Sequence, residues 1–152
     1  MKKSVLILLT FVPILVGFLI NFSIMVPVIG SVSFTLLPLA TTVFWFYLGN
    51  KFAQSGWNVI SSVLIANATG ILSLLIYIWQ FWFRAADTRN LVLAALSQYF
   101  SASVPMYLFG WIITAFGSQT YTIMLSMQIF AVVFMMLVFA CGFWWGKHRT
   151  RN

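Results

Sequence analysis

Charged residues divide this chain into long charge-free stretches, and their spacing is the feature that most constrains its fold. No charged residue lies between Lys3 and Lys51, between Lys51 and Arg84, or between Arg89 and Lys147. An α-helix rises about 1.5 Å per residue, so it crosses a hydrocarbon core about 30 Å thick with roughly 17–25 apolar residues. The three stretches therefore have room for two, one and two membrane-spanning helices.

Composition supports lipid as the solvent. The 152 residues are 62% hydrophobic and 6% charged, with a mean hydropathy of +1.03. An ordinary soluble domain is about 45–50% apolar and about 25% charged, and a soluble fold of this length has too little interior to bury so much apolar surface. No segment alternates with the period of a barrel strand. We therefore predict an all-α integral membrane protein.

Proline, glycine and polar residues mark the breaks within the two longest stretches. Residues 27–31 contain Pro and Gly, and residues 117–120 are the most polar uncharged cluster in the second half. We expect a single transmembrane domain over 1–152 that ends in a basic tail at 147–152. Its bundle of about five transmembrane helices is predicted over 5–26, 32–49, 57–83, 91–116 and 121–146.

The fourth of these helices has an alternative interpretation. It contains Pro105, and residues 91–104 carry several polar side chains. One kinked span is the preferred interpretation. If this segment is instead interfacial or re-entrant, the chain has four spans.

The basic residues indicate orientation. Net charge is +7, and every Lys and Arg lies at the end of a predicted span. This placement is typical of topology signals and of contacts with anionic lipid headgroups, and it does not form the basic stripe of a nucleic-acid site. The positive-inside rule places the C-terminal tail on the cytoplasmic side of a cell membrane, together with the Arg84–Arg89 turn.

Titratable chemistry is scarce. The chain has no Glu, and it has one Asp, one His and one Cys, namely Asp87, His148 and Cys141. Paired carboxylates, a Ser-His-Asp arrangement within the membrane and a metal-ligand set all need more of these groups. We therefore predict no catalytic residues, no metal site and no cofactor, and we do not expect an enzyme.

Neutral polar and small residues remain as candidates for packing between helices or for contact with a ligand. Amides within apolar segments are costly against lipid and are expected to face protein. Small residues four apart let two helices approach closely, as in the seam formed by Ser62, Ala66 and Gly70. The candidate residues are Ser62, Ala66, Asn67, Gly70, Gln80, Gln98 and Gln128.

Three functions fit these features. The leading hypothesis is a non-catalytic accessory, regulatory or immunity-type module that acts through helix contacts, with the lipid bilayer and a membrane-protein partner or second copy as its partners. The first alternative is a membrane-embedded small-molecule binding subunit of a transporter. The second is a small oligomeric pore, although apolar helices without a polar stripe argue against a water-filled channel.

Overall fold

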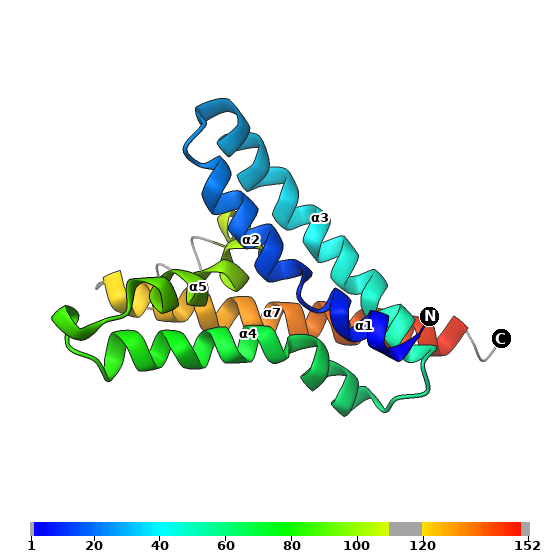
Figure 1. Cartoon of the computed structure of the whole chain (residues 1–152). Helices are drawn as coiled ribbons and strands as arrows, with labels where there is room; N and C mark the ends of the chain where they lie inside the picture. Colours follow the sequence, from blue (N-terminus) through cyan, green and yellow to red (C-terminus); the bar gives the residue numbers. More distant parts are fainter. Residues whose placement is uncertain (1, 110–119, 150–152) are drawn as a thin grey trace.

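The computed structural model describes residues 2–109 and 120–149, and the regular elements of these residues are all helical (Figure 1). The all-α prediction is therefore confirmed. The longer elements are α1 (Lys3–Leu9), α2 (Val12–Ser23), α3 (Pro27–Ala53), α4 (Val59–Trp82), α5 (Leu91–Ala102) and α7 (Thr120–Arg149). Two short 3-10 helices, η1 (Ala86–Thr88) and η2 (Met106–Leu108), lie on either side of α5.

Four segments of the described residues are long and apolar enough to cross a membrane. They have mean hydropathies from 1.6 to 2.6, and they are Lys3–Ser23, Pro27–Ala53, Val59–Trp82 and Met124–Arg149. The chain is thus a multi-pass integral membrane protein, and its helices contact the lipid bilayer. The four-span alternative fits these lengths, because α5 has only 12 residues.

Proline positions explain where the first two spans differ from their predicted bounds. The predicted helix 5–26 is divided at Thr10 and Phe11, because Pro13 in the first turn of α2 has no N–H to continue α1. The predicted helix 32–49 begins five residues earlier, at Pro27. Proline is favoured in the first turn of a helix, so Pro27 starts α3 where the sequence suggested a break.

The preferred single span over 91–116 is wrong in its described part. Helix α5 ends at Ala102, and Ser103 and Pro105 separate it from η2. Proline cannot donate a backbone hydrogen bond and restricts the residue before it, which ends the helix here. Residues 110–116 of the prediction lie outside the described residues. The helices predicted over 57–83 and 121–146 agree with α4 and α7 to within three residues.

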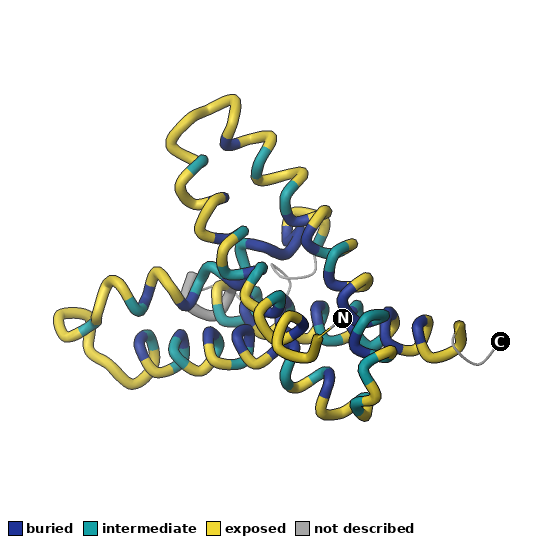
Figure 2. Tube along the Cα trace, turned by 45° about the vertical axis from the view of Figure 1, so that its right-hand side comes forward, coloured by how far each residue is buried: buried dark blue, intermediate teal, exposed yellow. Residues whose placement is uncertain are grey.

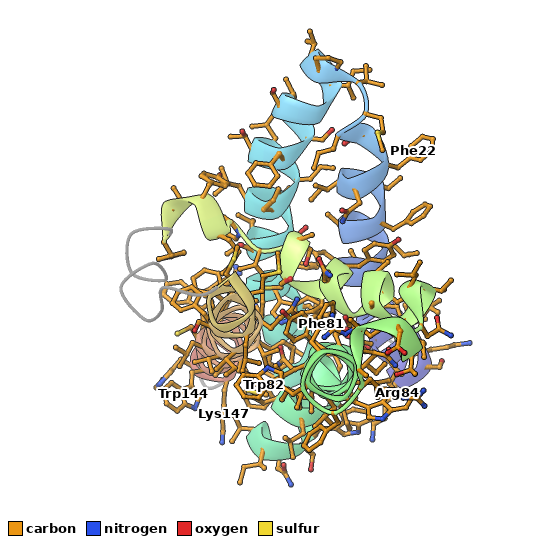
Figure 3. The ribbon with its side chains drawn as sticks, turned by 90° about the vertical axis from the view of Figure 1, so that its left-hand side faces the viewer. Phe22, Phe81, Trp82, Arg84, Trp144 and Lys147 are labelled. Carbon is orange, nitrogen blue, oxygen red and sulfur yellow. The ribbon has the colours of Figure 1, made fainter. Side chains whose placement is uncertain are left out.

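The helices form two groups that diverge from a shared centre. Helices α4 and α7 lie side by side, whereas α2 and the first half of α3 form an arm that leaves them at an angle (Figures 1 and 3). The outer part of the arm is largely exposed, and buried residues gather where the two groups meet (Figure 2). The core at this junction includes Trp45, Ala66, Phe100, Met135 and Phe139.

The contacts also place the ends of the bundle. The ammonium group of Lys3 lies 5.5 Å from the ring centroid of Trp57, so α1 begins beside the α3–α4 connection. Gly146 near the end of α7 packs against Asn50 near the end of α3. Both described ends of the chain therefore lie at one end of the bundle (Figure 1).

The Arg84–Arg89 turn lies at the opposite end, because it follows the far end of α4 (Figure 1). The sequence predicts that this turn and the C-terminal tail share one side of the membrane, whereas the structure places the turn and the end of α7 at opposite ends of the bundle. That prediction assumed two full spans between the turn and the tail, and α5 is too short to be one of them.

Candidate functional site

Helix α5 enters the bundle from the end that holds the Arg84–Arg89 turn and ends near the middle of its neighbours. Its Tyr99 backbone lies directly against Gly17 of α2, and its Phe100 ring lies over Gly70 at the centre of α4. At about 1.5 Å per residue, its 12 residues cover about half of a hydrocarbon core. It is therefore too short to span a membrane, and its inner end lies among the longer helices.

Non-helical backbone at membrane depth is tolerated where protein surrounds it or where it lines a cavity. Two adjoining cavities lie at the inner end of α5, with volumes of about 190 and 130 Å³. Both are lined by Gln98, Ser101 and Met127. The larger is completed by Asn21, Phe34, Ala102, Val104 and Met106, and the smaller by Tyr77, Met124 and Gln128.

Gln128 is the polar group of this site that most needs a partner. Its side chain is only 4% exposed, and its Oε1 atom has no hydrogen-bond partner among the residues that the structure describes. Buried polar atoms are nearly always bonded, and leaving one unpaired is costly. No hydrogen bond to the Gln98 side-chain amide is found within the described part of the chain either. The Gln98 amide, which lines both cavities, therefore has hydrogen-bonding capacity for a molecule in them, whereas the Gln128 oxygen is enclosed by protein atoms.

No family model, curated protein or solved structure matches this chain. The site must therefore be interpreted from its own geometry. Of the predicted candidates, this geometry brings together Gln98 and Gln128. Asn21, which lines the larger cavity, is also an amide within an apolar segment. Ser101 and Tyr77 were not among the candidates, and the only sequence signal for Ser101 was the polar first half of the 91–116 segment.

Asn67 and its neighbours lie elsewhere, in the contact between α4 and α3. The Asn67 side chain accepts a hydrogen bond from Trp45 Nε1 at 3.3 Å and donates one to the Val63 carbonyl at 2.9 Å. Ser62 and Ala66 are fully buried beside it. An amide with both ends bonded inside the protein has a packing role here, and it is not available to a ligand in the α5 cavities.

Gln80 also has a local partner. Its side-chain oxygen accepts the Asn90 N–H at 2.9 Å, and it is 1% exposed. It therefore fixes the connection between α4 and α5 and does not line either cavity.

A second, apolar groove lies between α3 and α7. It measures about 460 Å³ and is lined by Thr42, Val43, Phe46, Phe134, Leu137, Val138 and Cys141. The close approach of the two helices beside it depends on glycine, because a Cβ atom at Gly142 would collide with the Phe46 carbonyl. This groove offers little to hold a polar molecule. In the described residues, no three His, Cys, Asp or Glu side chains come together as metal ligands.

Proposed function

We propose that this chain is a non-catalytic membrane protein that binds a small molecule in the cavities at the inner end of α5. The observation that carries the proposal is the polar lining of the two cavities, to which Gln98 and Ser101 contribute in both and the buried Gln128 side chain in the smaller one. Polar side chains gathered at a cavity within an apolar bundle are typical of a binding site, where a few polar groups orient a ligand.

The cavity volumes set the size of the ligand. Drug-sized sites measure roughly 300–1,000 Å³, and a cavity of about 150 Å³ holds a benzene molecule. The cavities of about 190 and 130 Å³ therefore suit a molecule of about that size, or the end group of a longer one.

Composition supports a binding role without catalysis. General acid–base chemistry needs a titratable group close to the reacting atoms. Asp87 lies in the exposed turn before α5, and His148 lies in the last turn of α7. Both are outside the cavities, whose polar residues are amides and hydroxyls.

The charges support an orientation with both described ends on the cytoplasmic side. Five of the seven Lys and Arg residues in the described part of the chain lie at that end of the bundle: Lys2, Lys3, Lys51, Lys147 and Arg149. The opposite end has Arg84 and Arg89 together with Asp87, the only acid. Positive residues favour the cytoplasmic side, so α5 enters from the outer side in this arrangement.

Native mass spectrometry of the full chain, released from its host membranes, tests the binding proposal. We expect a small-molecule adduct on the parent protein and on a Thr42→Val control, which alters the apolar groove. Gln128→Leu should lose the adduct. Without ligand, the Gln128→Leu variant should melt at a higher temperature than the parent, because the substitution removes the buried Gln128 oxygen that has no hydrogen-bond partner in the described residues. An equal adduct on parent and Gln128→Leu would overturn the proposal.

The exposed arm favours a second function, which is contact with another membrane protein or a second copy. Phe22, Met25 and Val28 near its tip are 75%, 85% and 78% exposed, and Phe22 points away from the bundle (Figure 3). Apolar faces of this kind suit an accessory or regulatory module. A photo-crosslinking residue at position 22 would capture such a partner in intact membranes, whereas crosslinks to lipid alone would reject this function.

A further inference from the structure

We infer that the apolar groove between α3 and α7 binds an acyl chain of an anionic phospholipid whose headgroup lies at the basic end of the bundle. This site is separate from the α5 cavities and does not depend on the proposed function. The groove measures about 460 Å³, and its lining is apolar apart from the Thr42 hydroxyl. That hydroxyl already donates to the Pro38 carbonyl at 2.9 Å. The groove therefore offers dispersion contacts alone, which suits a hydrocarbon chain.

The groove opens toward the membrane and not toward the interior of the bundle. Val43 on the α3 wall is 70% exposed, and Leu137 on the α7 wall is 61% exposed. Both helices contain a candidate membrane span, so the side chains exposed on them face lipid. A lipid tail can enter the groove from the side without any movement of the helices.

The depth of the groove matches the leaflet at the basic end. Eight residues, or about 12 Å of helix, separate Val43 from Lys51 on α3, and eight separate Cys141 from Arg149 on α7. One leaflet contributes about 15 Å of hydrocarbon core, half of the whole. A lipid whose phosphate is level with Lys51 and Arg149 therefore has its tails at the depth of the groove.

Positive charge continues the α3 wall toward that end. Val43, Tyr47 and Lys51 follow one another at four-residue spacing, which places them on successive turns of one helix face. The Lys51 ammonium group lies 5.1 Å from the ring centroid of Tyr47. The lysine side chain therefore reaches back along the helix toward the groove.

The α7 wall continues in the same way. The same spacing places Trp145, which is 63% exposed, and the exposed Arg149 beyond Cys141. Tryptophan is favoured at the level of the lipid headgroups. A phosphate at this end of the groove would meet positive charge from both helices, and Asp87, the only acid, lies at the opposite end of the bundle. This charge pattern favours an anionic lipid over a zwitterionic one.

Competition between two phospholipids with identical tails tests the headgroup. Native mass spectrometry of the full chain in detergent, with equal amounts of dioleoyl phosphatidylglycerol and dioleoyl phosphatidylcholine, measures which lipid stays bound. We expect the parent to retain phosphatidylglycerol. Combining Lys51→Gln with Arg149→Gln should lower this preference by about fivefold for each charge removed. Arg84→Gln removes a charge at the opposite end and should keep the preference of the parent.

Cys141→Phe tests the place of the tail, because the larger side chain occupies the groove. We expect this variant to retain about tenfold less phosphatidylglycerol than the parent. Leu75→Phe, which adds a ring at an exposed position of α4, should behave like the parent. Equal retention by Cys141→Phe and Leu75→Phe would overturn the groove as the tail site.

The remaining outcomes concern the headgroup and the occupant. A parent without preference, or a preference lowered as much by Arg84→Gln as by the Lys51 and Arg149 substitutions, would overturn the anionic lipid. A dimer signal that Cys141→Phe abolishes would assign the groove to a second copy of the chain and would also overturn the inference.

Discussion

The side chain of Gln80 binds the backbone of Asn90, and this contact joins the end of α4 to the start of α5. Gln80 Oε1 accepts the Asn90 N–H at 2.9 Å, while Arg89 Nε donates to the Gln80 carbonyl at 3.1 Å. Asn90 in turn caps α5 by accepting from the backbone N–H groups of Val92 and Leu93. One buried amide therefore fixes the point at which α5 begins.

Gln80→Leu should destabilise the protein. The substitution keeps the volume of the side chain but leaves the Asn90 N–H without its acceptor, which costs about 1–3 kcal/mol. Thermal denaturation in detergent measures the effect. Gln54→Leu is the matched control, because the Gln54 amide also bonds a nearby Asn but is exposed. Equal melting temperatures of the two variants would show that the hydrogen bond from Asn90 to Gln80 does not stabilise the protein.

Gly70→Leu should also lower the melting temperature. A Cβ atom at Gly70 would lie 2.5 Å from the Phe100 ring, and overpacking of this kind costs about 1–3 kcal/mol. Asn67→Leu should lower the melting temperature by a similar amount, because the buried Trp45 Nε1–H loses its acceptor, which costs about 1–3 kcal/mol. Leu75→Ala serves as the control, since Leu75 is 58% exposed to the lipid side. If Gly70→Leu melts like the parent, α5 does not pack on α4 as described.

Gly142→Ala should separate α3 from α7. The added methyl group meets the backbone carbonyl of Phe46, which cannot move as a flexible side chain would. We expect a loss of about 1–3 kcal/mol in the same detergent assay. Cys141→Ala, on the neighbouring exposed residue, should behave like the parent. A tolerated alanine at position 142 would contradict the close helix crossing.

Cysteine labelling in intact cells tests the orientation. In a Cys141→Ser background, Gln54→Cys and His148→Cys should be protected from a membrane-impermeant maleimide, and Ala86→Cys should react. The reason is that positions 54 and 148 lie at the basic end of the bundle and position 86 at the other (Figure 1). If Ala86→Cys and His148→Cys are labelled from the same side, the Arg84–Arg89 turn and the C-terminal tail share one side of the membrane, as the sequence predicted.

Some elements could be predicted because their signals are local. Lys51 and Arg84 bracket α4, so hydropathy alone places that span to within two residues. The end of α5 could not be predicted in this way. Membrane helices tolerate proline when neighbours satisfy the freed backbone groups, so Pro105 fits either a kinked span or a helix end. The packing of Phe100 on Gly70 distinguishes the two, and that contact joins residues far apart in sequence.

The candidate site shows the same limit. The expectation that amides within apolar segments face protein holds for Asn67 and Gln128, which are buried, but Asn21 is exposed and Gln98 is half-buried. Gln80, another candidate, is buried as well. Sequence could not tell which of them has a partner. Trp45 lies 22 positions from the Asn67 it bonds, and Asn90 lies 10 positions from Gln80. Only the three-dimensional arrangement leaves Gln128 with an unbonded oxygen among the described residues.

The 12 residues of α5 are too few to insert into a bilayer as an independent span. Helix α5 packs mainly against α2 and α4, which are synthesised before it and can hold it in the membrane. Helix α7, which supplies Met124, Met127 and Gln128 to the cavity walls, is synthesised after α5. The cavities at the inner end of α5 are therefore complete only when α7 has joined the bundle.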